Sequence, residues 1–177
     1  MKPLSAFLPA CALAALSFAQ TPAPAAAPAV PAREEPKVMV TLKVTDAVVS
    51  APFVLKDGAV SQPAQTEVSA GGKAVFSFTV AKAGDYVMVA VVNAPDEDSN
   101  SFFLNVDAPP EDPLMIWDME VTKGFEERTV SWRGSGDSST DEISPKVFKL
   151  SAGAHKLIVV GREPSQLKSI SIRPVGK

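Results

Sequence analysis

The residue types that most often do chemistry in enzymes are scarce in this chain of 177 residues, which has one histidine, His155, and one cysteine, Cys11. A hydrolytic triad needs a serine, a histidine and a carboxylate in mutual reach, and no G-x-S-x-G segment marks a nucleophile. His155 follows the turn sequence SAGA and opens the apolar run HKLIVV, as a residue at a strand edge does. We therefore expect His155 to be a structural residue at the surface or rim of a sheet.

The acidic residues give no recognisable catalytic pair. A glycosidase needs two opposed carboxylates, and a zinc site built on His155 would need carboxylates for all its other side-chain ligands. The acidic candidates lie in turn sequences without such a pairing: Glu126, Glu127, Asp137, Asp141 and Glu142. The sequence therefore predicts a protein that is not an enzyme and that holds no metal or other cofactor.

The N-terminal segment predicts export. Residues 1–19 carry one basic residue, Lys2, and then an apolar run that closes with SFA, a pattern typical of a secretory signal peptide. The run is short and contains Pro9, so it is a poor membrane span, and no other candidate span follows. Cys11 is either an ordinary residue of this run or, in LPAC, the site of a lipoprotein anchor. We expect a periplasmic or extracellular protein.

Residues 20–36, QTPAPAAAPAVPAREEP, form a linker in which proline favours extended polyproline II structure. The linker is either a spacer or a tail without a role. Residues 37–177 are long enough for one domain with its own core, and after cleavage this chain has no cysteine for a disulfide. The net charge is −3 and the basic residues are interspersed, so nucleic acid is not an expected partner.

From residue 37 onward, short apolar segments alternate with turn sequences. Residues 38–44, VMVTLKV, and 73–80, KAVFSFTV, place apolar side chains at every second position, and 86–92, YVMVAVV, is apolar on both faces and predicts a central strand. Further strands are predicted at 101–106, 114–119, 128–132, 146–150, 156–160 and 169–172. This pattern predicts an all-β fold, an antiparallel two-sheet β-sandwich of the jelly-roll type.

Several of these segments, taken in order, resemble a known family. They are FSFTVAKAGDYVMVAVV, DSNSFFLNVD, IWDM, RTVSWRGSG and VFKLSAGAHKLIVVGREPSQLKSISI. They resemble the galactose-binding-like β-sandwich domains, above all the carbohydrate-binding modules of families 6 and 35. The resemblance covers about residues 38–174 and is most specific in the hairpin around Gly153 and His155. It implies a binding module without catalytic machinery, in which the histidine belongs to the hairpin.

The resemblance also implies a structural calcium ion, held by two glutamates of the first strand and an aspartate of the last. The corresponding positions look like Lys43, Thr45 and Lys168, which leaves Asp46 as the only nearby carboxylate. Ca²⁺ requires several oxygen ligands, carboxylates above all. We therefore expect no calcium at this position.

Carbohydrate sites combine apolar and aromatic side chains with a few polar groups. Trp117 falls where the family places a ligand-facing tryptophan, and it is either a stacking platform or a core residue between the sheets. Relatives often carry an aromatic residue near Glu127, which is charged here, and we expect Trp132 and Tyr86 to be structural. The polar candidates are either ligands or solvated residues in or beside loops: Asn93, Asp98, Asn100, Arg162 and Gln166.

Two functions remain open at this point. One is a secreted, non-catalytic module that recognises a glycan at a loop or face site with aromatic stacking. The other is a structural or protein-interaction subunit of the cell envelope without a sugar site, favoured by the low aromatic content and the missing calcium ligands. The polar loop at residues 134–145 would suit either function as a contact surface.

Overall fold

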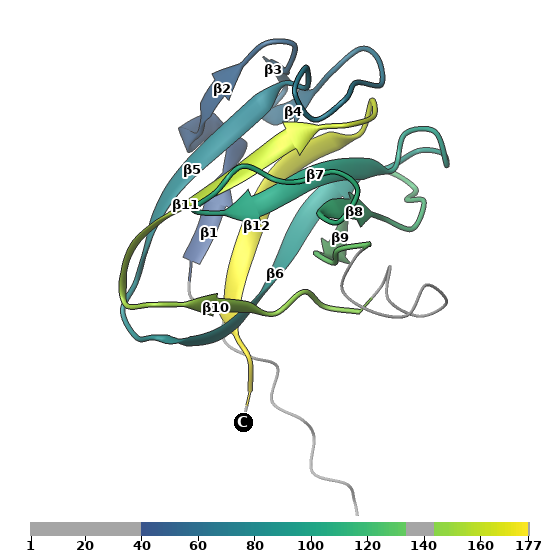
Figure 1. Ribbon diagram of the computed structural model, residues 1–177. Coiled ribbons are helices and arrows are strands. Elements are labelled where there is room, and N and C mark those ends of the chain that lie inside the picture. The colour runs from purple at the N-terminus through teal and green to yellow at the C-terminus, as the bar shows by residue number, and fades with distance from the viewer. Residues whose placement is uncertain (1–39, 134–143, 177) are drawn as a thin grey trace, which may run out of the picture. The chain divides into compact units, whose positions relative to one another are not determined.

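The computed structural model describes residues 40–133 and 144–176 (Figure 1). This part of the chain contains no α-helix, only one short 3-10 helix, η1 (Val44–Asp46), and no helix in it is long and apolar enough to cross a membrane. The strands are β1 (Val40–Lys43), β2 (Val48–Ser50), β3 (Val54–Lys56), β4 (Ala59–Ser61), β5 (Lys73–Val80), β6 (Gly84–Asn93), β7 (Ser101–Val106), β8 (Ile116–Asp118), β9 (Glu126–Thr129), β10 (Phe148–Leu150), β11 (Gly153–Gly161) and β12 (Gln166–Pro174).

The strands form two antiparallel sheets. In the seven-stranded sheet the order is β10-β6-β12-β4-β3, with β1 also paired to β12 and β9 to β6; in the five-stranded sheet it is β2-β5-β11-β7-β8. Figure 1 shows the five-stranded sheet in front of the seven-stranded one. The predicted antiparallel two-sheet β-sandwich is therefore confirmed.

Strand β5 shows how the sequence pattern builds the core between the sheets. Its residues Ala74, Phe76, Phe78 and Val80 are buried, whereas the residues between them face outward. Burial of each phenylalanine or valine of this set stabilises the fold by roughly 1.5–3 kcal/mol relative to its exposed state. The long strand β6, predicted as central, pairs with β12, β9 and β10.

Strands β2, β3 and β4 are not predicted by the sequence pattern, because three residues contain too little alternation to be recognised. The hairpin of β3 and β4 does carry a local signal at Asp57 and Gly58, which have φ of 51° and 73°. Positive φ at both central residues is the geometry of a two-residue type I′ turn, for which Asp-Gly is a preferred sequence.

The predicted strands at 73–80 and 101–106 have the predicted ends, and the other predicted strands differ by one to three residues at one or both ends. Two of them illustrate the reason. The strand expected at 114–119 is the shorter β8, and the strand expected at 128–132 is β9, which begins two residues earlier at Glu126. Both strands are limited by their partners, since β8 pairs with β7 only over residues 101–103 and β9 pairs with β6 only over 89–92.

Some predictions concern residues outside the described part of the chain. They are the signal peptide at 1–19 with Cys11, the linker at 20–36, and the loop residues Asp137, Asp141 and Glu142. These stay predictions, as does the start of the domain at residue 37.

Candidate functional site

Trp117 was the strongest candidate for a stacking platform, and its side chain is fully buried. Its Nε1 donates a hydrogen bond to the main-chain oxygen of Thr129 at 3.0 Å, and its ring lies 6.0 Å from the ring of Phe102, centroid to centroid. A platform must present a ring face to solvent. The prediction that Trp117 binds a ligand is therefore wrong, and its alternative, a core residue between the sheets, is correct.

Asn100 and Arg162 come together around a buried carboxylate, that of Glu163. Glu163 accepts hydrogen bonds from the Asn100 main-chain N–H at 3.0 Å and from the Arg162 guanidinium, which also donates to Ser101 Oγ at 2.8 Å. The Asn100 amide donates to the Glu97 carboxylate at 3.1 Å. These bonds tie the loop before β7 to the loop after β11, so both predicted ligands are engaged within the protein.

Asn93 and Gln166 meet on the outer face of the seven-stranded sheet. They are register partners, and Asn93 Nδ2 donates to Gln166 Oε1 at 3.0 Å, while Thr122 Oγ1 donates to Asn93 Oδ1 at 3.4 Å. Within the described residues Gln166 Nε2 has no protein partner, so it can donate to a ligand. Asp98 lies apart in an exposed loop, where its N–H donates to Asp96 Oδ1 at 3.1 Å.

Phe125 is an exposed aromatic residue that the sequence analysis did not identify as a site residue. It precedes Glu126, the first residue of β9, which pairs with Val92 of β6. Phe125 therefore comes level with Asn93, and 37% of its surface is exposed. The Nζ atom of Lys168 lies 3.7 Å from the centroid of the Phe125 ring.

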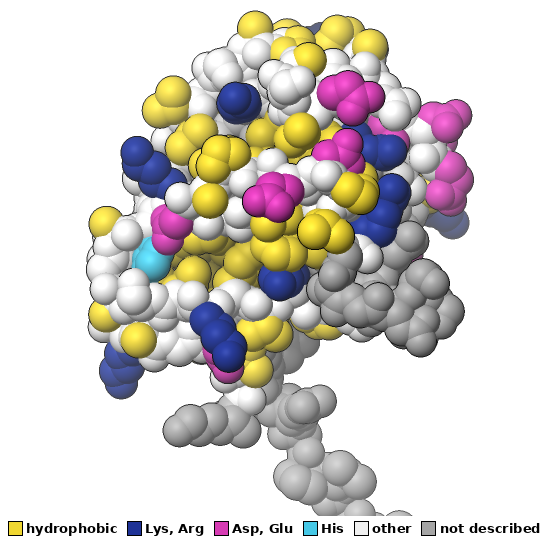
Figure 2. All heavy atoms as spheres, viewed as in Figure 1, with side chains coloured by type: hydrophobic (Ala, Val, Ile, Leu, Met, Phe, Trp, Pro, Cys, Tyr) yellow, Lys and Arg dark blue, Asp and Glu magenta, His cyan; other side chains and the backbone are white. Residues whose placement is uncertain are grey.

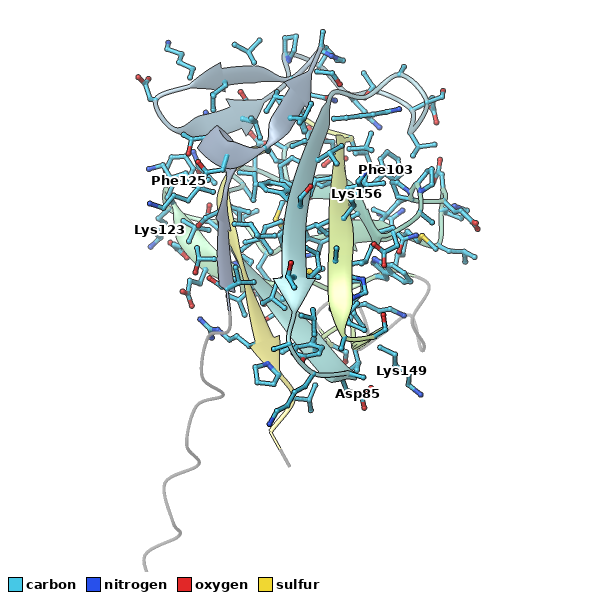
Figure 3. The ribbon with its side chains drawn as sticks, turned by 90° about the vertical axis from the view of Figure 1, so that its left-hand side faces the viewer. Asp85, Phe103, Lys123, Phe125, Lys149 and Lys156 are labelled. Atoms are coloured by element: carbon cyan, nitrogen blue, oxygen red, sulfur yellow. The ribbon has the colours of Figure 1, made fainter. Side chains whose placement is uncertain are left out.

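We name this region the face site. It consists of Asn93, Phe125, Gln166 and Lys168. Figure 3 shows Phe125 on the side of the sandwich formed by the seven-stranded sheet, opposite the side that carries Phe103. A sequence signal could have found Phe125, because it follows the turn TKG and shares the parity of the exposed Glu127 on the following strand.

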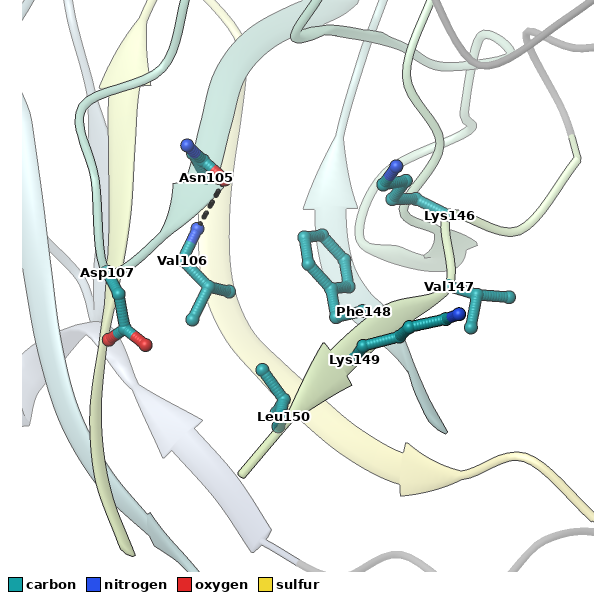
Figure 4. A pocket seen from close by; sticks show the side chains of 8 residues that line it. All are labelled: Asn105, Val106, Asp107, Lys146, Val147, Phe148, Lys149 and Leu150. Atoms are coloured by element: carbon teal, nitrogen blue, oxygen red, sulfur yellow. Dashed lines mark hydrogen bonds between the residues drawn. The ribbon is translucent and has the colours of Figure 1, made fainter. Parts of the chain in front are cut away.

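A concave region lies at an open edge of the sandwich, between the end of β7 and β10. We name it the edge hollow; its volume is about 410 Å³. The residues that line it are Asn105, Val106, Asp107, Lys146, Val147, Phe148, Lys149 and Leu150 (Figure 4). Figure 2 shows apolar side chains inside this hollow, next to the histidine. The two walls are distant in sequence, so no local pattern could predict the hollow.

Trp132 packs beside the edge hollow. Its Nε1 donates to the Leu104 main-chain oxygen at 2.9 Å and its ring meets that of Phe148 edge-on at 5.6 Å, so it packs against the core as predicted. The Nζ atom of Lys146 lies 4.0 Å from the centroid of the Trp132 ring, and partial burial lowers the pKa of this lysine. Tyr86 is buried in the core, in agreement with its predicted structural role.

His155 is buried, whereas the sequence predicted a surface or rim position. Its Nδ1 lies 2.6 Å from Asp107 Oδ2 and its Nε2 lies 2.9 Å from the main-chain oxygen of Ser151. Hydrogen bonds to these two acceptors raise the pKa of His155 although burial opposes the rise. Because Nε2 faces a main-chain carbonyl, the imidazole has no serine hydroxyl to activate, which agrees with the predicted structural role.

Asp107 links His155 to the edge hollow, since it forms part of the wall. Its φ of 61° is in the left-handed region, where aspartate is among the better tolerated residues. Its Oδ1 accepts the Lys156 N–H at 2.8 Å. Partial burial raises the pKa of Asp107, but the hydrogen bonds from His155 and Lys156 outweigh it, and the pKa lies below its ordinary value.

The residues that the resemblance assigns to a calcium position are two lysines and a threonine: Lys43, Thr45 and Lys168. Lys43 ends β1 and pairs with Ser169, the neighbour of Lys168, so the two lysines come from adjacent strands. Thr45 Oγ1 donates to Asp46 Oδ1 at 3.4 Å. Among the described residues no three His, Cys, Asp or Glu side chains gather as a metal site requires. The residues at this position do not fit a dication.

No protein-family model matches this sequence, and no curated protein matches it. Solved structures do. A family 35 carbohydrate-binding module from Clostridium thermocellum has a TM-score of 0.53 and 11% identity, covering 75% of this chain and 95% of that one. A family 6 module from Cellvibrio mixtus lichenase 5A, in complex with cellotriose, has a TM-score of 0.51 and 14% identity, covering 79% and 100%.

A third similar structure is a larger enzyme, the Podospora anserina GH26-CBM35 β-(1,4)-mannanase. Its TM-score is 0.50 at 15% identity, and the match covers 78% of this chain but only 28% of the mannanase chain. At these identities the likeness is one of fold. The chain thus has the galactose-binding-like β-sandwich fold of the carbohydrate-binding modules of families 6 and 35.

Proposed function

We propose that this chain is a non-catalytic carbohydrate-binding module that binds a glycan at the face site. The observation that carries the proposal is the position of Phe125. Within the described residues it is the one aromatic side chain with more than a third of its surface exposed, and it lies level with the amide pair of Asn93 and Gln166. The fold shared with solved carbohydrate-binding modules supports the same class of function.

The face site offers the two kinds of groups that a sugar needs. The Phe125 ring packs against the apolar C–H face of a sugar, while the amides exchange hydrogen bonds with its hydroxyls. Gln166 and Thr122 already hold the Asn93 side chain in place. Because the amide pair is ordered before the ligand arrives, little conformational entropy is lost on binding.

Lys168 adapts the site to its ligand. Its ammonium group lies over the Phe125 ring, and a lysine side chain is flexible. A sugar ring can therefore replace the ammonium on the aromatic face, and the ammonium can then donate to a sugar hydroxyl. Because the outer face of a sheet does not enclose its ligand, the site suits a polysaccharide chain better than a single sugar.

Export completes the proposal. A signal peptide at residues 1–19 delivers the module to the periplasm or the medium, where it meets polysaccharides. In the alternative form of export, a lipid attached to Cys11 anchors the module to a membrane. The competing function is a protein-interaction subunit of the cell envelope. The observation that favours it is the exposure of Val48 (74%) and Val54 (58%) on the edge strands β2 and β3.

The test is a binding screen of the full chain on a polysaccharide panel that includes mannan and cello-oligosaccharides, followed by titration calorimetry. We expect Phe125→Ala to weaken binding at least tenfold, which corresponds to about 1.4 kcal/mol. Asn93→Ala and Gln166→Ala should each weaken it several-fold, and Asp98→Ala tests the one predicted ligand in the exposed loop. Leu114→Ala, an apolar residue 54% exposed away from the face site, is the matched control.

Two outcomes contradict the proposal in different ways. If no glycan on the panel binds, the function is wrong and the interaction subunit becomes the better account. If a glycan binds equally well to Phe125→Ala and to the parent protein, the function stands and the face site is wrong.

A further inference from the structure

We propose that the edge hollow is a second ligand site, and that it binds a small organic anion whose negative group is attached to an apolar body, such as an aromatic carboxylate. Three features of the hollow support this ligand class: the apolar side chains of its floor, a lysine that forms no ion pair with another described residue, and an excess of lysine over carboxylate in its lining. The proposal does not depend on glycan binding, because the edge hollow and the face site share no residue.

Apolar side chains form the floor of the edge hollow, and polar and charged side chains form its rim. Phe148 and Leu150 of β10 lie across from Val106 of β7, as Figure 4 shows. The amide of Asn105 at the rim is engaged, since its Oδ1 accepts the Val106 N–H at 2.8 Å and its Nδ2 donates to Pro109. A sugar would leave hydroxyls unpaired on this floor, which costs free energy. An apolar ring instead gains about 25 cal/mol for each Å² that it buries.

Lys146 provides the positive charge. Its ammonium group lies against Trp132, and among the ion pairs of residues 40–133 and 144–176 none involves Lys146. Partial burial lowers the pKa of Lys146 because its charged form is poorly solvated. An anion that binds beside Lys146 restores the lost solvation, and Figure 4 shows Lys146 and Lys149 on the wall opposite Asp107.

Asp107 is the one acidic residue among the described residues that line the hollow, and its two oxygens accept hydrogen bonds from His155 and from the Lys156 N–H. Lys146 and Lys149 outnumber this carboxylate, so the lining of the hollow is net positive. Protonation of His155 offsets the charge of Asp107 further. The charge of the hollow is therefore complementary to an anion.

The size of the hollow suits one small molecule. Its volume of about 410 Å³ is within the range of about 300–1,000 Å³ that is usual for small-molecule sites. A single ring with one charged substituent fits this space, whereas a polysaccharide chain needs an open face.

The test is an NMR titration of the ¹⁵N-labelled full chain with benzoate. Benzyl alcohol serves as the uncharged ligand with the same ring, and glucuronate as the anion on a polar ring. We expect benzoate to shift the amide signals of Val106, Phe148 and Leu150 and to bind at least tenfold more tightly than either control ligand. Lys146→Gln should weaken benzoate at least tenfold, whereas Lys156→Gln, on the outer face of the five-stranded sheet (Figure 3), should not.

Lys146→Arg keeps the charge and should retain benzoate binding, which separates loss of the charge from damage to the fold. Three results would overturn the proposal: no shifts at the hollow, equal binding of benzoate and either control ligand, or unchanged binding by Lys146→Gln. Phe125→Ala should leave benzoate binding intact while it weakens glycan binding. The two proposals can therefore fail separately.

Discussion

An aromatic ring with a lysine ammonium over its face occurs twice, once within the face site and once beside the edge hollow, in different surroundings. At the face site the ammonium of Lys168 lies 3.7 Å from the centroid of the Phe125 ring, and at the edge hollow that of Lys146 lies 4.0 Å from the centroid of Trp132. Phe125 is exposed on a sheet face beside two amides. Trp132 is half-buried, hydrogen-bonded to the main chain and packed against the core.

Under the two proposals, the surroundings of an aromatic–lysine pair, rather than the pair itself, decide which ligand it suits. On the sheet face the neighbouring groups are amides that can exchange hydrogen bonds with hydroxyls. In the hollow the neighbours include the apolar side chains of Val106, Phe148 and Leu150 within a polar rim, and the lysine is partly desolvated. We therefore propose a neutral polyhydroxylated ligand for the Phe125–Lys168 pair and an anion with an apolar body beside the Trp132–Lys146 pair.

The largest difference in stability between the two regions is expected when the aromatic ring of each is removed. Trp132→Ala removes a packed indole and its hydrogen bond and should lower the free energy of unfolding by about 3 kcal/mol. Phe125→Ala removes a ring that is 37% exposed and should cost less than about 1 kcal/mol. Urea denaturation of both variants measures the difference. Equal losses in the free energy of unfolding would mean that the two rings contribute equally to stability, which would contradict the difference between the two regions.

A smaller effect on stability is expected from a change of pH. It should arise beside the edge hollow, because His155 lies there and the face site has no histidine. The raised pKa of His155 gives stability that is complete below its ordinary pKa of 6.5 and is lost as pH rises through the folded-state value. The lowered pKa of Asp107 gives stability that is complete above 3.8 and is lost as pH falls through its folded-state value. Stability from this pair is therefore greatest between pH 3.8 and 6.5.

The measurement is urea denaturation at about pH 5.5 and about pH 9. The parent protein should lose roughly 1 kcal/mol more than His155→Gln between these two values, a modest figure because Asp107 is half-exposed. Benzoate binding should also weaken over this range, since neutral His155 no longer cancels Asp107, whereas glycan binding should not. If the stability of the parent protein and of His155→Gln changed equally between the two pH values, His155 would not be the source of the pH dependence.

The smallest effect is expected from the lysines themselves. Lys168→Met removes an exposed cation–π contact and should cost about 0.5 kcal/mol. Lys146→Met removes a similar contact but also relieves the desolvation of a partly buried charge, so its stability should be unchanged or slightly raised. Thermal denaturation of the two variants, compared with Lys123→Met as a control, gives the difference. A larger loss for Lys146→Met than for Lys168→Met would show that the surroundings of Lys146 favour its charge.

The two regions were accessible to sequence reasoning to different degrees. Asn93 and Gln166 were identified because both lie where a strand meets a loop, and antiparallel pairing brings them into register. Arg162 was identified as a surface candidate, yet it binds the buried Glu163. The edge hollow was not predicted, because Asp107 follows β7 and Lys146 precedes β10. These strands belong to different sheets, and only the packing of the sheets sets the space between them.

What the sequence by itself determined is the layered β architecture, because alternation along a strand assigns side chains to one face or the other without reference to distant residues. What only the tertiary structure decided is which of those faces remain open. Trp117 lies on an edge strand and is fully buried, whereas Phe125 beside the outer sheet face is exposed. The physical reason is that burial depends on which other segments cover a face, and the covering segments come from distant parts of the chain.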